Sequence, residues 1–463
     1  MGYSGGKDST ATLQLIWSAL KELAPEQRIK PVHVISTDTL VENPVVSAWV
    51  RKSLERMEKA AQDQGLPIQV HQLTPELQDS FWVNLIGKGY PAPRPKFRWC
   101  TERLKIKPSN AFIMNVVKES GEAILILGTR RAESSARSAR MSALDRVRGR
   151  LVPNQSLPNS LVFSPIEDWT NDDVWLYLMQ HPNPWGYNNK ELLTMYQGAS
   201  EDGECPLVVD TTTPSCGSSR FGCWVCTLVD EDKSMSAMIQ NDEEKEWMLP
   251  LLELRNKFNV ANDRPLRDFR RMTGHIQLFR DRLIHGPYTQ ESREMWLKEV
   301  LEAQIWVQEN GPSDVADLEL VSLAELHEIR RIWVMEKHEI EDRLPQIYKS
   351  VTDSEFPGGP LDDATVFGSH EIDLLKEVVD GDPLHFELLR ELLHVELRFR
   401  TMSRRAGLFD AIDEAFERNS YGNEKEATER AQRESQARAS AQTGEYAPVA
   451  FEGSDADPQM VGS

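Results

Sequence analysis

The apolar positions in the first 200 residues follow two alternating patterns. Short apolar runs at Val32–Ser36, Ile68–Leu73 and Ile124–Gly128 are typical of buried strands. Segments with three- and four-residue apolar spacing, such as Ser9–Leu23, lie between them and are typical of helices. Strands that alternate with helices predict an α/β fold, with a parallel sheet and helices on both faces.

The pattern changes after residue 199, which divides the chain into four predicted parts. Residues 1–199 form the α/β domain, and residues 200–231 are rich in Cys, Thr, Ser and Gly and are predicted to be an irregular loop. A loop of this length inside a domain is usually functional. Residues 232–419 show helical spacing throughout and predict a helical region. Residues 420–463 contain almost no large apolar residues, which predicts a disordered tail.

The chain is acidic overall. The chain has 53 Lys plus Arg against 73 Asp plus Glu, a formal net charge of −20, which opposes indiscriminate binding to nucleic acid. Any contact with DNA is therefore expected to be local or to depend on a partner. No apolar run approaches the roughly 20 residues that a membrane helix needs, and the N-terminus lacks the layout of a secretion signal. We expect a cytoplasmic protein with no membrane contact.

Two basic groups stand out against this acidic background. They suggest a local surface for a polyanion beside the predicted nucleotide site, although the outer arginines could equally face solvent. The first group contains Arg130, Arg131, Arg137, Arg140, Arg146, Arg148 and Arg150, and the second contains Arg94, Lys96, Arg98, Arg103, Lys105 and Lys107.

A glycine-rich phosphate loop is predicted at the N-terminus. Its sequence is SGGKDST, from Ser4 to Thr10 with Gly5, Gly6, Lys7, Asp8 and Ser9 between, and a helical pattern follows directly. Glycines can turn backbone N–H groups toward an anion, the helix N-terminus adds partial positive charge, and Lys7 supplies a full charge. The spacing differs from GxxxxGK[ST] and resembles the SGGxDS loop of the N-type ATP pyrophosphatases, which cleave between the α- and β-phosphates.

This loop is expected to follow a buried strand, but only three residues, Met1 to Tyr3, precede Ser4. The sequence therefore predicts that the first strand is missing. Loss of a central parallel strand would expose the core and leave the loop without an anchor. We expect either a misassigned gene start or an impaired copy.

Further segments resemble the PAPS reductase branch of the same superfamily. Asp38 follows a predicted strand where a nucleoside would bind, and Gly128, Arg130 and Arg131 belong to GTRRAESSAR, which resembles a phosphate-side segment of that family. The segment PIEDWTNDDVW, residues 165–175, resembles the family signature P-[LI]-x-D-W-T-x-x-D-V-W. We interpret Trp169 and Trp175 mainly as packing residues and Thr170 as a helix cap.

The cysteines indicate a metal site. The chain has five, and four of them, Cys205, Cys216, Cys223 and Cys226, fall within residues 205–226. Four thiolates can hold either zinc or an iron–sulfur cluster, and spacing alone does not separate the two. Cys100 is the fifth: it is either free to carry sulfur as a persulfide or a ligand in place of Cys205. Because basic residues flank Cys100, we expect a lowered thiol pKa if it is free.

Taken together, SGGKDST, GKGYPAPRPKFRWCT (residues 87–101), GTRRAESSARS, PIEDWTNDDVW and above all CGSSRFGCWVCT (residues 216–227) resemble the DndC family of DNA-phosphorothioation proteins. The resemblance is strong from Ser4 to about Ser234 and weak in the helical region. It implies an adenine-nucleotide alpha-hydrolase-like fold and an ATP pyrophosphatase with a [4Fe-4S] cluster. Such a protein acts with a cysteine desulfurase and other DNA-phosphorothioation proteins to replace a non-bridging phosphate oxygen of DNA by sulfur.

The implied chemistry assigns roles to the predicted site residues. The phosphate loop would bind ATP with Mg²⁺, with Lys7 on the phosphates and Asp8 positioning the metal-bound triphosphate. Cys100 is the candidate sulfur carrier. DNA is the implied substrate, contacted through a local basic patch.

Two other functions remain compatible with the sequence. A PAPS or APS reductase shares three segments, but those reductases use a cysteine near the C-terminus, and this chain has none after Cys226. A non-catalytic scaffold of a DNA-modification complex, with structural zinc at the cysteine loop and a degenerate nucleotide pocket, is the alternative from a different class.

Overall fold

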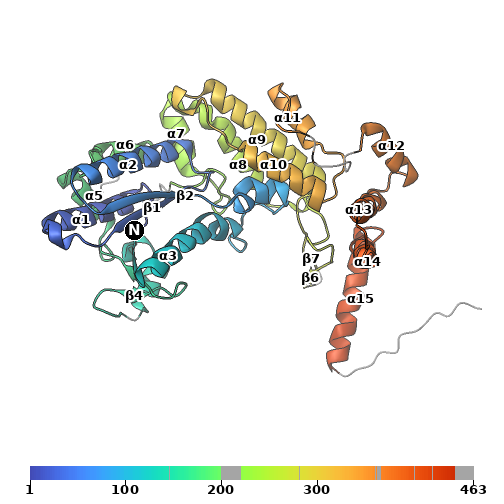
Figure 1. Cartoon of the computed structure of the whole chain (residues 1–463), viewed down its shortest axis with the longest axis horizontal. Helices are drawn as coiled ribbons and strands as arrows, with labels where there is room; N and C mark the ends of the chain where they lie inside the picture. The colour runs from blue at the N-terminus through green and yellow to red at the C-terminus, as the bar shows by residue number, and fades with distance from the viewer. Residues whose placement is uncertain are drawn as a thin grey trace, which may run out of the picture. The chain divides into compact units, whose positions relative to one another are not determined.

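The apolar runs of the first half fold into the strands of a largely parallel sheet (Figure 1). The computed structural model describes residues 1–144, 146–199, 221–280, 282–359, 361, 367–400, 402–419 and 421–443. Its strands are β1 (Val32–Thr37), β2 (Ile68–Leu73), β3 (Ala123–Ile126), β4 (Val152–Pro153), β5 (Ser160–Phe163), β6 (Leu278–Phe279) and β7 (Arg282–Leu283). Its α-helices are α1 (Lys7–Glu22), α2 (Pro44–Asp63), α3 (Lys107–Ser120), α4 (Ser135–Ser142), α5 (Asn171–Gln180), α6 (Asn189–Gly198), α7 (Lys233–Asn241), α8 (Leu249–Phe258), α9 (Gln290–Asn310), α10 (Leu323–Arg331), α11 (Leu344–Thr352), α12 (Ser369–Val378), α13 (Pro383–Arg400), α14 (Leu408–Arg418) and α15 (Glu424–Thr443).

Hydrogen bonds fix the order of the strands. β1 pairs in parallel with β2, β3 pairs in parallel with β5, and β4 lies antiparallel to β5. Residues 1–3 lie between the two parallel pairs, because Tyr3 N donates to Ile35 O at 2.8 Å and Gly2 N donates to Ile126 O at 3.1 Å. The predicted α/β fold with a parallel sheet is confirmed.

Residues 1–3 lie in the position of the first strand that the sequence predicted to be missing. Gly2 forms a parallel bridge with Ile35, and Ile35 N donates to Met1 O at 2.8 Å. Met1 and Tyr3 are both buried. The three residues before Ser4 therefore occupy the central position between β1 and β3, and they anchor the glycine-rich loop at the end of the sheet.

Successive side chains of β1 point to opposite faces of the sheet, and helices pack against both faces. Val34 packs with Leu13 of α1 and Met57 of α2 in one buried cluster. His33, on the opposite face of the strand, contacts Phe112 of α3 with ring centroids 5.6 Å apart. The sheet is therefore covered by α1 and α2 on one face and by α3 on the other.

The second half is mainly helical, as predicted, with one added hairpin formed by β6 and β7. Residue contacts divide the chain into two compact units: Met1–Leu266 with Tyr288–Val366, and Arg267–Pro287 with Phe367–Ser463. The first unit thus joins the α/β part to a large share of the helical part.

Part of the segment expected to be disordered is helical. Residues 424–443 form α15, while residues 444–463 lie outside the described part of the chain. The helix is rich in Ala, Glu, Arg and Gln, which have high helix propensity, and it carries ion pairs at four-residue spacing between Lys425 and Glu429 and between Arg430 and Glu434. Local propensity therefore supports this helix, in which Ala427 is buried and most of the other described side chains are exposed. In the described part of the chain, no helix is both long and apolar enough to span a membrane.

Candidate functional site

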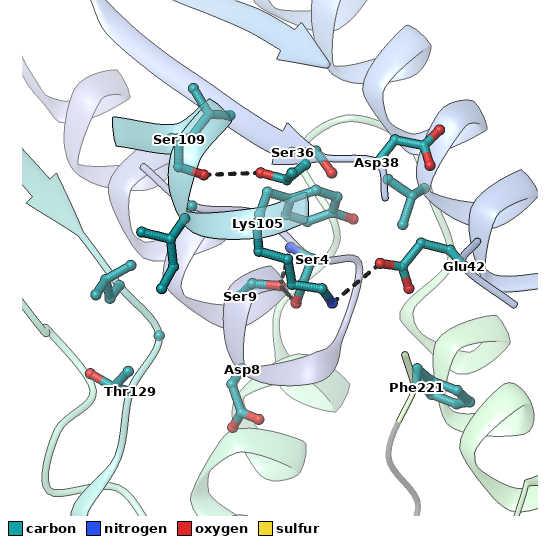
Figure 2. A pocket seen from close by; sticks show the side chains of 18 of the residues that line it. Ser4, Asp8, Ser9, Ser36, Asp38, Glu42, Lys105, Ser109, Thr129 and Phe221 are labelled. Atoms are coloured by element: carbon teal, nitrogen blue, oxygen red, sulfur yellow. Dashed lines mark hydrogen bonds and ion pairs between the residues drawn. The ribbon is translucent and has the colours of Figure 1, made fainter. Parts of the chain in front are cut away.

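A cavity of about 570 Å³ opens at the carboxyl end of the parallel strands. Its walls come from the glycine-rich loop, the end of β1, the first turns of α2 and the segment after β3 (Figure 2). Ligands of open parallel sheets bind at this edge, beyond the ends of the strands. The predicted nucleotide-binding residues that line the cavity are Ser4, Asp8, Ser9, Asp38 and Gly128.

The glycine-rich loop is held by its own serine hydroxyls. Ser4 N donates to Ser9 Oγ at 3.2 Å, and Ser9 Oγ donates to Gly6 O at 2.9 Å. Gly5 has φ +74°, and a Cβ atom there would meet Val50 at 2.5 Å. A residue with a side chain would therefore be both strained and crowded at this position. The loop leads directly into α1, so the cavity faces a helix N-terminus, where anions bind favourably.

Lys7 and Arg130 both bind the carboxylate of Asp8. Lys7 Nζ lies 3.1 Å from Asp8 Oδ2, and Arg130 Nε lies 2.6 Å from Asp8 Oδ1. Lys7 also lies over the ring of Tyr196, 5.4 Å from its centroid, and its backbone N–H donates to the Tyr196 hydroxyl at 3.3 Å. Neither cation lines the cavity, whereas Asp8 does. Two of the predicted phosphate ligands, Lys7 and Arg130, therefore contact Asp8 and do not line the cavity themselves.

The segment after β3 approaches α1 closely. A Cβ atom at Gly128 would lie 2.7 Å from Asp8 O, so only glycine allows this contact. Thr129, Glu133 and Arg137 continue along the cavity wall, with Glu133 Oε1 accepting from Arg130 N at 2.9 Å. The predicted ligand Arg131 instead pairs with Glu167 and Asp168 outside the cavity.

Asp38 and Glu42 form the acidic end of the cavity. Asp38 accepts from Leu40 N at 2.9 Å and from Gln72 Nε2 at 3.0 Å, and burial raises the pKa of its carboxyl. Glu42 binds Lys105 Nζ at 3.3 Å, and both side chains line the cavity (Figure 2). Burial acts to lower the pKa of Lys105, but Cys223 and Glu42 outweigh it, and the pKa is raised. Lys105 is therefore a cation at neutral pH.

Cys223 lies directly behind this acidic end. Its Sγ is 3.3 Å from Thr39 Oγ1 and 3.7 Å from Glu42 Oε1, and Trp224 N donates to Val41 O at 2.9 Å. Burial, followed by the charge of Glu42, raises the pKa of Cys223 to about 12. The thiol is therefore protonated at neutral pH unless a metal binds it, and Glu42 is the partner that keeps Lys105 charged.

Cys226 and Cys100 are the other two cysteines among the residues that the structure describes. Cys226 N donates to Cys223 O at 3.1 Å in a tight turn, and Arg255 Nε donates to Cys226 O at 2.9 Å. Cys100 is half-buried, and its interaction with Cys226 is one of the causes of its pKa shift. Cys205 and Cys216 lie outside the described residues.

The prediction of a lowered pKa for Cys100 is wrong. Burial is the largest cause and raises the pKa, while the hydrogen bond to Thr101 and the charge of Lys105 lower it too little to compensate. Cys100 packs against the main hydrophobic cluster, so the flanking cations act on it weakly. The basic residues near Cys100 in the sequence were therefore a poor guide to its environment.

The donor set is compatible with a thiolate metal site but does not complete one. Among the residues that the structure describes, no group of three or more His, Cys, Asp or Glu side chains is arranged to hold a metal ion. Cys223 and Cys226 share the tight CxxC turn that thiolate sites use, and further thiols would have to come from Cys100 or from the undescribed segment.

The outer arginines of the first basic group are neutralised by carboxylates. Arg146 binds Glu167 at 2.6 Å, Arg148 binds Glu122 at 2.7 Å, and Arg150 lies 3.8 Å from Asp168. These pairs connect the segment to Glu122, the residue before β3, and to the PIEDWT segment. That segment itself acts as predicted: Thr170 caps α5 by accepting from Asp173 N, and Trp175 is fully buried.

Several residues of the cavity were not singled out from the sequence as ligands. Lys105 and Arg137 were noted only as members of basic groups, and their places in the wall depend on a π-helical turn and on the packing of α4. Other polar cavity residues that sequence reasoning missed are Ser36, Thr37, Glu42, Ser47, Gln72, Ser109 and Asn110, and Phe221 adds an aromatic ring. Polar side chains of these types carry no spacing signal in the sequence.

Comparison with known proteins shows what the part of the chain that contains this cavity is similar to. Residues 1–228 match the phosphoadenosine phosphosulfate reductase domain. Over 185 residues the chain is 27% identical to an uncharacterized protein of Methanocaldococcus jannaschii, and this match covers 40% of the present chain and 32% of that protein. The chain thus spans about a third of the length of this curated relative.

Proposed function

We propose that this chain, whose first 228 residues carry a phosphoadenosine phosphosulfate reductase domain, is an ATP pyrophosphatase and sulfurtransferase that activates the DNA backbone for phosphorothioate formation. The observation that carries the proposal is the shared wall between the nucleotide cavity and the thiols. Glu42 lines the cavity together with Ser4 and Ser9, and the same carboxylate lies 3.7 Å from Cys223 Sγ. A nucleotide and a sulfur centre would therefore be separated by one side chain.

The proposed reaction begins with ATP in the cavity. A non-bridging oxygen of a DNA phosphate attacks the α-phosphorus, the α–β bond breaks, and pyrophosphate leaves. The loop from Ser4 to Ser9 and the N-terminus of α1 hold the departing pyrophosphate, and Asp8 positions Mg²⁺ on the triphosphate. Lys7 and Arg130, which both contact the Asp8 carboxylate, are the proposed cations that offset the charge of the metal-bound triphosphate.

The second step transfers sulfur. A phosphate oxygen is a poor leaving group, but the DNA–adenylate has AMP as its leaving group. A sulfur nucleophile, supplied by a cysteine desulfurase with the other DNA-phosphorothioation proteins, forms the sulfur–phosphorus bond while the bond to AMP breaks. Cys100 is the proposed carrier of that sulfur as a persulfide: its outer sulfur forms the bond to phosphorus, and a thiol reductant then attacks the Cys100 sulfur, which releases the phosphorothioate and leaves a disulfide between Cys100 and that thiol. Lys105, held at the cavity wall by Glu42, would balance the charge that develops between the phosphates and the thiols.

The cysteines fit a [4Fe-4S] cluster as the proposed resident cofactor. Cys223 and Cys226 would bind it, together with Cys205 and Cys216, or with Cys100 in place of Cys205. When bound, it would supply redox-active iron beside the nucleotide cavity.

Pyrophosphate release from ATP tests the first step. We expect release in the presence of Mg²⁺ and DNA, and an Asp8→Asn variant to lose on the order of a hundredfold in rate, because the carboxylate no longer positions the metal. Asp63→Asn, an exposed change at the end of α2, is the matched control and should keep the full rate. Full activity in Asp8→Asn, or the absence of an AMP–DNA adduct while sulfur still enters DNA, would contradict the mechanism.

The cofactor is tested by anaerobic purification. We expect a brown protein with broad absorbance near roughly 400 nm, and a strong reduction of this band in Cys223→Ser. Metal analysis of the same purified protein complements the spectrum. One equivalent of zinc in a colourless protein would instead support the scaffold role, with the cysteines as a structural zinc site.

A further inference from the structure

The second basic group contains an exposed turn that differs from the neutralised arginines at 146–150. Arg94 N donates to Phe97 O at 3.2 Å, and Phe97 N donates to Arg94 O at 2.8 Å, so Pro95 and Lys96 form a two-residue tip. Phe97 is 46% exposed, although a large aromatic ring would normally be buried. The side chain of Lys96 is also exposed.

The charges of this turn are largely unopposed. Arg94 pairs with the buried carboxylate of Asp263 at 3.0 Å, which fixes the base of the turn. Arg98 donates only to a backbone oxygen, that of Pro95, at 3.1 Å. Within the described ranges, no carboxylate forms an ion pair with Lys96 or Arg98. A polyanion could therefore bind here without breaking existing ion pairs, whereas binding at Arg146, Arg148 and Arg150 would first have to break three of them.

Both ends of the turn are fixed beside the thiols. Thr227 Oγ1, one residue after Cys226, donates to Pro93 O at 2.6 Å in a buried contact. At the other end Trp99 Nε1 donates to Pro91 O at 2.9 Å, and Cys100 follows. The turn is therefore hydrogen-bonded to the residue after Cys226 and continuous with the segment that carries Cys100, the proposed sulfur carrier.

We propose that the turn from Arg94 to Arg98 is the nucleic-acid contact of this chain. Phe97 stacks on an accessible base, and Lys96 and Arg98 contact the adjacent backbone phosphates. An aromatic ring between cations is the arrangement that single-strand binding surfaces use, because every base offers a face for stacking and every linkage a charge. The choice of DNA as the polyanion rests on the proposed function, whereas the location rests on the turn itself.

Fluorescence anisotropy with a fluorescein-labelled single-stranded oligonucleotide tests this location in the full chain. Lys96→Ala with Arg98→Ala should weaken binding more than tenfold and reduce the salt slope of log K by about 1.4, since each phosphate contact on a single strand contributes about 0.7. Phe97→Ala should weaken binding roughly tenfold with an unchanged slope, and Phe97→Tyr should retain it, because stacking needs a ring and not a charge.

Arg148→Ala with Arg150→Ala is the matched control, since it removes the same charge from cations that are already paired. It should leave affinity and slope within about twofold of the parent chain. Equal losses in the control and the turn variant, an unaffected Phe97→Ala variant, or a parent chain that binds no oligonucleotide would each overturn the inference. Near-ultraviolet circular dichroism confirms that each variant is folded.

Binding of ATP, measured on the same variants, separates this inference from the proposed function. The turn variants should bind ATP like the parent chain, because none of their residues lines the nucleotide cavity. Failure of the parent chain to bind ATP would reject the proposed function and leave the oligonucleotide result standing. Normal ATP binding together with unaltered oligonucleotide binding in the turn variants would reject the inference alone.

Discussion

At the scale of single residues, the proposed nucleotide cavity depends on a close approach between two backbone segments. A Cβ atom at Gly128 would lie 2.7 Å from Asp8 O and 3.0 Å from Thr12 Oγ1. We expect Gly128→Ala to push the segment after β3 away from the first turn of α1. The free energy of unfolding should fall by about 1–3 kcal/mol, as for other overpacked sites, and ATP should bind about tenfold more weakly.

Gly198→Ala is the control for this prediction. Gly198 ends α6, has ordinary backbone angles, and has no atom within 4 Å of the added methyl group. The change should be neutral or stabilise the protein by up to about 1 kcal/mol, since alanine restricts the unfolded chain. Urea denaturation and ATP titration of both variants give the comparison. Equal behaviour of the two alanine variants would mean that the contact of Gly128 with α1 does not shape the cavity.

Some features of single residues in the site could be predicted from the sequence, and others could not. The glycine-rich loop and Gly128 could be predicted, because backbone geometry restricts the residue types at those positions. The direction of Lys7 could not be predicted, since it is decided by Asp8 and by the ring of Tyr196, which is 189 residues away in the sequence. The raised pKa of Cys100 was missed for the same reason: tertiary packing, and not the neighbouring charges in the chain, sets its environment.

At the scale of secondary-structure elements, the pairing of β1 with β2 brings two histidines together. His33 Nδ1 lies 3.0 Å from His71 Nε2, and Phe112 of α3 contacts both rings. Burial lowers the pKa of each histidine, and for His33 the charge of His71 and then that of the N-terminal ammonium add to the effect, while Glu119 opposes it. The pair is therefore uncharged in the folded protein at neutral pH.

The sign of the resulting pH dependence follows from proton counting. Below about pH 6.5 the unfolded chain binds protons on these histidines that the folded chain does not, so the free energy of unfolding falls as the pH falls. We expect urea midpoints to decrease between pH 7.5 and pH 5.5, and the decrease to be smaller in a His33→Gln, His71→Gln double variant. His181→Gln, at an exposed histidine, should leave the pH dependence unchanged. A double variant with the parent dependence would contradict this account.

Element boundaries were predictable where side-chain period and buried surface agree. β2 spans the predicted residues 68–73, and β1 extends the predicted 32–36 by one residue. β3 covers Ala123–Ile126 where residues 124–128 were expected, because Gly128 already belongs to the cavity wall. The role of Met1–Tyr3 could not be seen in the sequence, since three residues carry no period and their place depends on hydrogen bonds to β1 and β3.

At the scale of the whole molecule, the first compact unit joins the α/β part to helices far along the chain. Trp82 is fully buried, its Nε1 donates to Leu320 O at 2.6 Å, and its ring contacts those of Trp224 and Phe258. Trp333 Nε1 likewise donates to Ile86 O at 2.9 Å. One hydrophobic cluster therefore includes the segment that precedes Cys100, the CxxC segment and the helices α8–α10.

A shared core of this kind should unfold as a unit. We expect Trp82→Ala to lower the free energy of unfolding of this unit by about 3–5 kcal/mol, the usual cost of truncating a buried tryptophan. Trp306→Ala, at a ring that is 48% exposed on α9, should change it by no more than about 0.5 kcal/mol. Tryptophan fluorescence and far-ultraviolet circular dichroism should report the same midpoint shift for Trp82→Ala, because the strands and the helices lose their common core together. Separate transitions, with only the helical signal shifted, would show instead that residues 1–199 fold independently, as the sequence pattern predicts. In that case Cys100 would be positioned by the α/β part alone, and the helices in its hydrophobic cluster would be dispensable for the placement of that thiol.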